Sequence, residues 1–179
     1  MPHHSALSNA PLSTRWRSYR RVPSTRLPRR WRDWLLHPGS LTQRLTEAAG
    51  GDFRVELSFQ GWGMPTLSEA RSLGIDPRQQ ALIREVRLIG RGQTWVYARS
   101  IIPASTLKGP LRKLRRLGNR SLGSLLFKEP TMHRGPIETC SLRLDGLLEP
   151  VSARRSVFYL RGLPLLVCEV FLPSLQRVQ

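Results

Sequence analysis

The chain has 179 residues, of which 40% are hydrophobic, and its 29 lysines and arginines against 12 acidic residues give a formal net charge of +17. This length allows one domain with a real core, and no apolar run approaches the roughly 20 residues of a membrane-spanning helix, which argues against stable membrane insertion. The basic balance suggests an anionic partner such as nucleic acid, but no base-stacking cluster or groove-reading helix accompanies it, so we expect no nucleic-acid binding.

Residues 1–25 are rich in Ser, Arg and Pro and show no sustained hydrophobic period. Such a segment buries too little apolar surface to fold, so we expect a disordered or loosely docked basic arm. It lacks the apolar core of a secretory signal, although its composition also fits an organelle transit peptide.

A single domain is expected over residues 26–179, with ordered structure from about Trp31. A short helix around Trp34 precedes a second helix, for which Ser40 and Gln43 form a capping box. Thr66 and Glu69 form another capping box, which opens a short helix that Gly74 ends. Two further helical segments are predicted at residues 107–117, where leucines recur near helical spacing opposite a basic block, and at residues 121–127.

Six segments have the alternating or apolar pattern of strands. The residues GRGQ and the Arg161–Gly162 pair indicate two hairpins. Short connections of this kind favour an α+β fold with a single six-stranded antiparallel β-sheet and helices covering one side. The strand segments are residues 53–60, 81–89, 94–102, 136–144, 153–160 and 163–172.

The motifs that the sequence lacks narrow the chemistry. There is no P-loop, no Gly-rich dinucleotide turn, no GxSxG elbow and no zinc-ligand spacing, and we expect no metal site. His133 lies in a loop and is interpreted as solvated. Cys140 and Cys168 lie in apolar alternating segments, which favours reduced thiols and a reducing compartment.

Two charged residues break the apolar pattern of their strands. Glu169 lies on the apolar face of residues 163–172, and Arg84 lies on the more apolar face of residues 81–89. A buried unpaired carboxylate costs on the order of several kcal/mol, so Glu169 must be protonated, paired or used. On periodicity alone, the two residues either pair with each other, reach out at a sheet edge, or form a site where the arginine grips a small carboxylate ligand.

Five segments carry motifs in a fixed order: WRDWLLHPGSLTQRL, ALIREVRL, TWVYARSIIPASTLKGP, LGNRSLGSLLF and ARRSVFYLRGLPLLVCEVFLP. Their order and separation resemble those of the chorismate pyruvate-lyases that open ubiquinone biosynthesis in Gram-negative bacteria. The resemblance extends from about Trp31 to Pro173. Leu41 stands where some members have methionine, Ser121 replaces a family proline, and the basic arm has no counterpart.

The resemblance implies an enclosed ligand cavity and a monomeric, cytoplasmic enzyme without metal or organic cofactor, with chorismate and 4-hydroxybenzoate as ligands. It places the arginine that holds the product's carboxylate at Arg84 and the carboxylate near its hydroxyl at Glu169. Leu41 and Leu122 correspond to further ligand contacts. The motifs do not fix the partner of the enolpyruvyl carboxylate; the candidates are Arg99, Arg154 and Arg155, with backbone amides as the alternative.

The reaction that the resemblance implies is cleavage of chorismate to 4-hydroxybenzoate and pyruvate. Arg84 would anchor the ring carboxylate, and Glu169, kept protonated by its apolar strand, would be the catalytic acid or only a hydrogen-bond partner. Two other functions stay open: a basic nucleic-acid-binding protein, and a non-catalytic small-carboxylate sensor, because ligand-binding domains of certain transcriptional regulators resemble this fold. A sensor would need a DNA-binding domain, and we expect no room for one before Trp31.

Overall fold

The computed structural model describes residues 15–21 and 27–178. Its α-helices are α1 (Arg29–Leu35), α2 (Leu41–Ala49), α3 (Leu67–Leu73) and α4 (Leu122–Leu126), and its 3₁₀ helices are η1 (Tyr19–Arg21), η3 (Ala104–Thr106), η4 (Gly109–Arg116) and η5 (Pro173–Val178). The strands are β1 (Arg17–Ser18), β2 (Phe53–Gly63), β3 (Ala81–Gly90), β4 (Gln93–Pro103), β5 (His133–Arg134), β6 (Glu138–Leu142), β7 (Val151–Leu160) and β8 (Leu163–Phe171).

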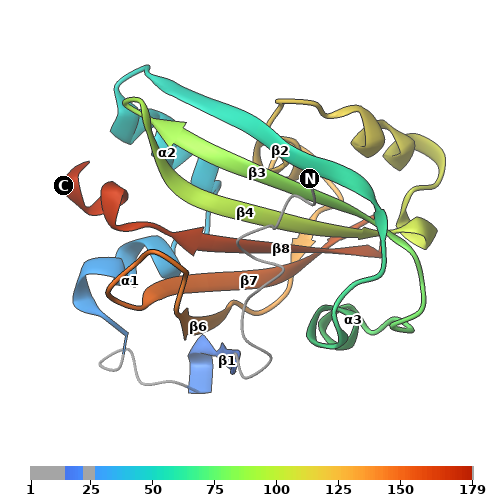
Figure 1. Cartoon of the computed structure of the whole chain (residues 1–179). Coiled ribbons are helices and arrows are strands. Elements are labelled where there is room, and N and C mark those ends of the chain that lie inside the picture. Colours follow the sequence, from blue (N-terminus) through green and yellow to red (C-terminus); the bar gives the residue numbers. More distant parts are fainter. Residues whose placement is uncertain (1–14, 22–26, 179) are drawn as a thin grey trace.

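All described strands belong to one antiparallel sheet in the order β1-β6-β7-β8-β4-β3-β2, with β5 paired to β7 (Figure 1). Each of the six predicted strands is present. The predicted count of six is nevertheless wrong, because β1 and β5 add two strands of two residues each. Segments so short carry no readable alternation, so their pairing depends on contacts distant in sequence.

The two hairpins form as predicted. Arg91 and Gly92 both have positive φ between β3 and β4, and Arg161 and Gly162 do the same between β7 and β8. A two-residue turn with positive φ at both positions matches the right-handed twist of the strands it joins. These turns fix the register of both hairpins, and through it the direction in which each side chain points.

One face of the sheet, here called the helical face, packs against α1, α2, α4 and η4 (Figure 1). It carries the even-numbered residues of β3, from Leu82 to Leu88. The other face, here called the α3 face, includes Ile83, which shares a core cluster with Leu73 of α3. The prediction that helices cover one side of the sheet is therefore wrong for α3. The capping box in the sequence predicts where α3 begins, but it does not indicate which face of the sheet α3 covers.

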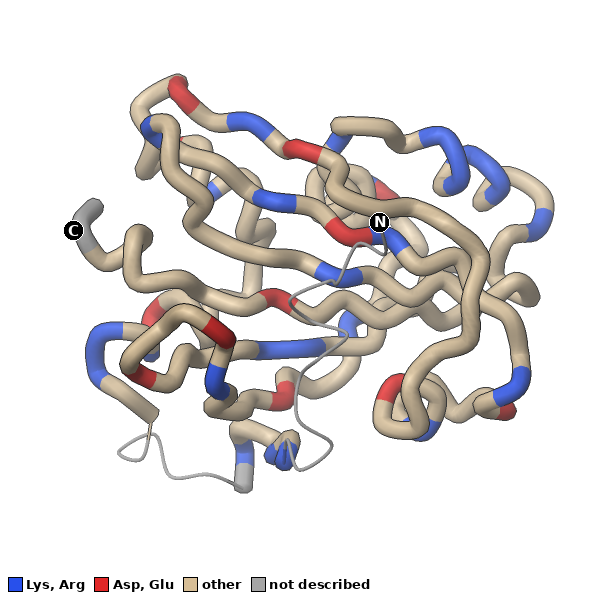
Figure 2. Tube along the Cα trace, viewed as in Figure 1, with Lys and Arg blue, Asp and Glu red and all other residues tan. Residues whose placement is uncertain are grey.

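The segment after β4 departs from the predicted helix. It forms two 3₁₀ helices, η3 and η4, although Leu111, Leu114 and Leu117 are all buried as a helical face would be. The three leucines recur every three residues, which suits the three-residue turn of a 3₁₀ helix. The exposed side of η4 carries the basic block, visible as a gathering of Lys and Arg in Figure 2.

Part of the predicted arm packs on the sheet. Residues 1–14 and 22–25 lie outside the described residues, but β1 pairs with β6 and Trp16 joins the core cluster on the α3 face. Among the described residues, none of the helices is both long and apolar enough to cross a membrane.

Candidate active site

Cross-strand pairing places two rows of side chains on the helical face. One row contains Arg84, Ser100, Val167 and Ser156 on β3, β4, β8 and β7, in that order. The neighbouring row contains Val86, Ala98, Glu169 and Arg154 on the same strands. Ala98 and Ser100 on β4 have small side chains, which leave space above the sheet between Arg84 on β3 and Arg154 on β7.

A pocket occupies this space. Ala98, Ser100, Val167 and Glu169 form its floor, and the first residues of α2 and α4 cover it. Its lining includes Leu41, Arg84, Leu122, Arg154 and Glu169, which the sequence predicts as site residues, together with Arg134. The parity of Arg84 and Glu169 is therefore confirmed, since both face the same pocket.

Arg84 is 2% exposed, and its partners within the described part of the chain are neutral. Its Nη2 donates to the carbonyl oxygens of Gly118 and Arg120, both at 2.8 Å, while its buried Nε has no partner among the described residues. Burial lowers the pKa of the Arg84 guanidinium to about 10, so it remains a cation at neutral pH. A carboxylate ligand would supply both the missing acceptor and the missing charge.

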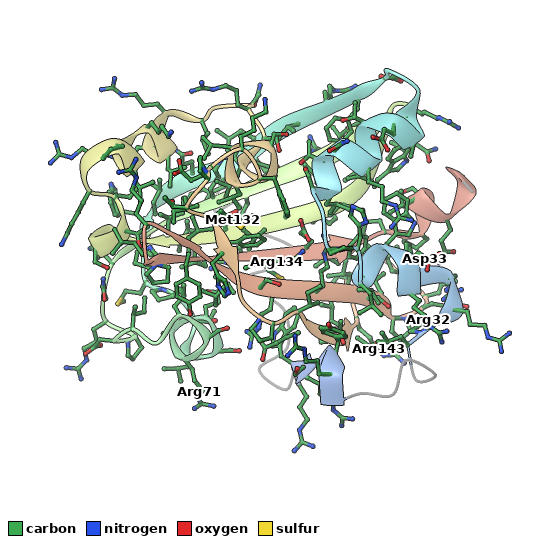
Figure 3. All side chains as sticks on the ribbon, turned by 180° about the vertical axis from the view of Figure 1, so that it is seen from behind. Arg32, Asp33, Arg71, Met132, Arg134 and Arg143 are labelled. Atoms are coloured by element: carbon green, nitrogen blue, oxygen red, sulfur yellow. The ribbon has the colours of Figure 1, made fainter. Side chains whose placement is uncertain are left out.

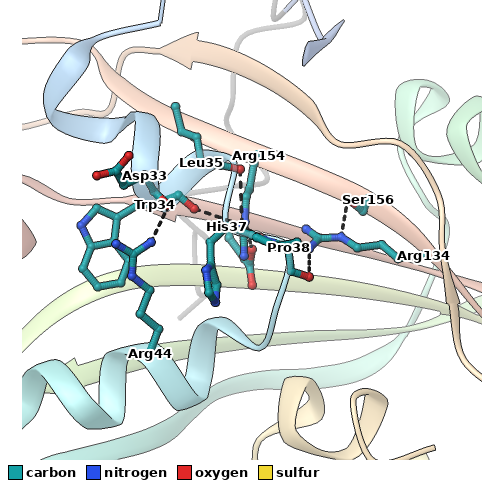
Figure 4. Close-up of polar contacts among 10 residues, drawn as sticks. Asp33, Trp34, Leu35, His37, Pro38, Arg44, Arg134, Arg154 and Ser156 are labelled. Carbon is teal, nitrogen blue, oxygen red and sulfur yellow. Dashed lines mark hydrogen bonds and ion pairs between the residues drawn. The ribbon is translucent and has the colours of Figure 1, made fainter. Parts of the chain in front are cut away.

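Glu169 pairs with Arg154 rather than with Arg84. Nε of Arg154 donates to Oε2 of Glu169 at 2.6 Å, and Nη1 of Arg154 donates to the main-chain carbonyls of Trp34, Leu35 and His37 (Figure 4). Arginine is a permanent cation in proteins, so this hydrogen bond is charge-assisted and its partner is the carboxylate form of Glu169. The sequence-based expectation that the apolar strand keeps Glu169 protonated did not take its ion pair with Arg154 into account.

Arg134 reaches the pocket from β5 and was not predicted from the sequence. Its Nε donates to Oγ of Ser156 at 3.1 Å, and its Nη1 donates to the carbonyl of Pro38 at 3.2 Å (Figure 4). Burial, together with the nearby Arg154, lowers the pKa of Arg134 to about 10. No periodic signal marks this residue, because it lies in a two-residue strand next to a loop.

Arg99 and Arg155 lie on the α3 face, on the opposite side of the sheet from the pocket. Nε of Arg99 donates to Glu69 at 2.7 Å, and its Nη1 donates to Glu85 at 2.6 Å. Nε of Arg155 donates to Glu138 at 2.6 Å. Of the three candidates for the second carboxylate, only Arg154 faces the pocket, because successive residues of a strand point to opposite faces.

The first residues of α2 and α4 meet over the pocket. Ser121, the N-cap of α4, accepts a hydrogen bond from Ser124 N at 3.0 Å, and its hydroxyl lies 2.7 Å from Oγ1 of Thr42 in α2. Leu41 and Leu122 follow their N-cap residues directly. The serine that replaces a family proline thus caps one helix and links it to the other.

Solved structures share this fold. The effector domain of PhnF from Mycobacterium smegmatis aligns with a TM-score of 0.53 at 18% identity, over 76% of this chain and 90% of that one. A GntR-family transcriptional regulator from Bacillus cereus aligns with a TM-score of 0.54 at 14% identity, over 69% of this chain and 93% of that one. Likeness at these identities shows the fold alone.

Sequence comparison gives a closer relationship. A probable chorismate pyruvate-lyase from Marinobacter nauticus is 45% identical over 148 residues, which cover 82% of this chain and 78% of the relative. A probable chorismate pyruvate-lyase from Methylococcus capsulatus is 41% identical over 155 residues, which cover 81% of this chain and 96% of the relative. The family model for chorismate lyase matches residues 15–178. The chain belongs to the chorismate lyase family.

Proposed function

We propose that the protein is a chorismate pyruvate-lyase, which cleaves chorismate to 4-hydroxybenzoate and pyruvate as the first step toward ubiquinone. Family membership supports this function, and one observation carries it: a single pocket unites Arg84 with Glu169 and has a net positive charge. Arg84, Arg134 and Arg154 against Glu169 leave two positive charges, three minus one, and chorismate is a dianion. The likeness to transcriptional regulators extends to the fold alone and does not favour the sensor alternative.

Arg84 is the anchor for the ring carboxylate in this proposal. Arg84 lines the pocket and its Nε has no partner among the described residues, and α2 begins at the pocket with Leu41. The first N–H groups of a helix have no partner within the helix and attract anions, so the start of α2 supports the same carboxylate. The lining residues above the floor, including Leu122, would enclose the ring between the sheet and the covering helices.

The reaction is an elimination that makes the ring aromatic. The bond between ring carbon 3 and the ether oxygen breaks, and the hydroxyl-bearing carbon 4 loses its proton. Enolpyruvate takes up a proton at its methylene carbon and becomes pyruvate. No electrons are exchanged with a second reactant and aromatisation supplies the driving force, so we propose that the enzyme works without a cofactor.

Glu169 is assigned the role of base in this elimination. As a carboxylate held by Arg154, it can receive the proton from carbon 4, which carries the hydroxyl that we expect to lie near Glu169. A carboxylate that is already hydrogen-bonded is fixed in position before the substrate arrives, and such positioning accounts for much of enzymatic rate enhancement. The acid role expected from the sequence is replaced by this one because of the ion pair.

We further propose a monomer that acts in the cytoplasm and binds no nucleic acid. Several of the arginines that raise the net charge are buried at the pocket or in ion pairs, namely Arg84, Arg99, Arg154 and Arg155. They are therefore not available to bind phosphate groups at the surface. Cys140 and Cys168 are both free thiols, which fits a reducing compartment.

The experiment that tests the function is a spectroscopic assay. Purified protein mixed with chorismate should convert it to 4-hydroxybenzoate, which is followed by its ultraviolet absorbance. Folded protein that leaves the chorismate spectrum unchanged would contradict the proposal.

A further inference from the structure

Arg134 is a half-buried cation whose partners among the described residues are all neutral. Besides Ser156 and Pro38, its Nη1 donates weakly to the carbonyl of His37 at 3.4 Å, and its guanidinium lies over the Phe158 ring at 5.1 Å from the centroid. Its Nη2 makes no hydrogen bond with the described residues. None of the ion pairs formed within residues 15–21 and 27–178 includes Arg134.

Arg154, in the same pocket, differs from Arg134 because its positive charge is paired with a carboxylate. It shares the carbonyl of His37 with Arg134, but its charge is balanced by Glu169 at 2.6 Å. Arg84, like Arg134, has only neutral partners among the described residues and takes part in none of the described ion pairs. The pocket therefore contains one neutralised arginine and two that are not neutralised.

The two uncompensated arginines lie on opposite sides of the pocket floor. Arg84 is on β3, and Ser156, which holds Arg134, is on β7 in the same cross-strand row. Three strand spacings separate these two positions, or roughly 14 Å between their Cα atoms, and Ser100 and Val167 lie between them. The side chains of Arg84 and Arg134 thus border the pocket from two sides (Figure 3 shows Arg134 over the sheet).

Two uncompensated cations beside one cavity, Arg84 fully buried and Arg134 half-buried, are costly unless a ligand neutralises them. Burial lowers the pKa values of both Arg84 and Arg134 only to about 10, so both charges persist at neutral pH. A ligand with two separated carboxylates could neutralise both arginines, whereas a monocarboxylate could neutralise only one of them. Chorismate has two carboxylates, whereas 4-hydroxybenzoate has one.

We infer that Arg134 is a second anion subsite, which binds the enolpyruvyl carboxylate of chorismate while Arg84 binds the ring carboxylate; this inference rests on the proposed function. The hydroxyl of Ser156 and the carbonyls of His37 and Pro38 fix the guanidinium, so little conformational entropy is lost when the ligand binds. After cleavage the ring product has lost the enolpyruvyl carboxylate, so it has no second carboxylate to bind Arg134. The subsite therefore distinguishes substrate from product.

The test separates these two ligands. Arg134→Gln and Arg134→Lys are compared with wild type for kcat, for KM with chorismate, and for competitive inhibition by 4-hydroxybenzoate. Loss of a charge-assisted hydrogen bond should raise KM for chorismate roughly 10- to 100-fold in the glutamine variant. The inhibition constant of 4-hydroxybenzoate should change less than about threefold, because the product does not use the subsite. Lysine keeps the charge and should restore part of the loss in KM.

Arg71→Gln is the matched control, since it removes one arginine charge from the exposed part of α3, where Figure 3 shows the side chain pointing outward. It should leave both constants unchanged, and thermal unfolding reports whether each variant is folded. If the glutamine variant does not fold, KM for chorismate and the inhibition constant of 4-hydroxybenzoate are compared in the lysine variant instead. An unchanged KM, or equal rises in KM and in the inhibition constant, would overturn the inference.

Failure of the proposed function is distinguishable from failure of this inference. If wild-type protein does not cleave chorismate, chorismate becomes a stable dianionic probe for calorimetry. Arg134→Gln should then weaken chorismate binding far more than 4-hydroxybenzoate binding. Equal weakening of both ligands would refute the second subsite even in that case.

Discussion

At the residue scale, Glu169 and Glu138 form a natural pair for comparison. Each accepts a hydrogen bond at 2.6 Å from the Nε of an arginine on β7, Glu169 from Arg154 and Glu138 from Arg155. The two arginines are adjacent in sequence and point to opposite faces of the sheet. Only Glu169 lines the pocket. A substitution with the same chemistry at both positions therefore separates catalysis from ion pairing.

Glu169→Gln should lower the turnover rate roughly 10²- to 10⁴-fold, because glutamine keeps the shape and an acceptor oxygen but cannot take a proton. The affinity for 4-hydroxybenzoate should change little. Arg154 keeps its three main-chain acceptors in this variant, which limits the loss of stability. Steady-state kinetics and calorimetry measure the two quantities.

The control is Glu138→Gln, which breaks the equivalent charge pair on the α3 face. It should lower the melting temperature while leaving the turnover rate within about threefold of wild type, since it touches no pocket residue. A stable Glu169→Gln variant with near-normal turnover would refute a catalytic role for Glu169.

At the element scale, the covering of the pocket depends on the junction between α2 and α4. Ser121 caps α4 and bonds with Thr42, and Gly123 fits closely, since a Cβ there would lie 3.1 Å from Oγ1 of Thr42. The five-residue α4 is too short to be stable by itself and depends on these contacts and on its buried leucines. The junction should therefore control how firmly the pocket holds a ligand.

Ser121→Ala should destabilise the protein by about 1 kcal/mol through loss of the N-cap, with more added if the contact with Thr42 is strong. We expect weaker binding of 4-hydroxybenzoate, because α4 would cover the pocket less firmly. Denaturant unfolding and calorimetry measure the two effects. Ser141→Ala, at an exposed position of β6, is the control. Tighter binding in the Ser121 variant would contradict this role of the junction.

Strand patterning predicts the pocket face better than it predicts the whole site. A period of two places Arg84 and Glu169 on one face, and the structure confirms this. The same rule separates Arg154 from Arg155, but the sequence does not tell which parity faces the pocket, because β7 is buried on both sides. Arg134 and the position of α3 depend on tertiary contacts that no local pattern encodes.

At the scale of the whole molecule, part of the basic charge lies inside the fold. Arg99 and Arg155 join acidic side chains on the α3 face, and Arg84, Arg134 and Arg154 border the pocket. What is left at the surface includes the basic block of η4 (Figure 2). Net charge alone therefore overstates how much of the surface suits a polyanion.

The N-terminal segment offers a test of the fold as a whole. Deleting residues 1–25 removes β1 and Trp16, whose ring lies 4.5 Å from the guanidinium of Arg155. The melting temperature should fall by about 2–4 °C if this segment contributes roughly 1 kcal/mol, a larger effect than the disordered arm expected from the sequence would have. The turnover rate should stay near wild type, because β1 and Trp16 pack away from the pocket. Deleting residues 1–14 leaves β1 and Trp16 in place and is the control; equal melting temperatures for both deletions would show that β1 adds no stability.

The most direct measurement is the stoichiometry of the products. Purified protein is incubated with chorismate, and 4-hydroxybenzoate and pyruvate are quantified by chromatography and by an enzymatic pyruvate assay. Cleavage at the pocket that contains Arg84 and Glu169 predicts equal molar amounts of both products, with product formation falling strongly in Glu169→Gln. Pyruvate accompanied by a different aromatic product, or no product from folded protein, would contradict the assignment.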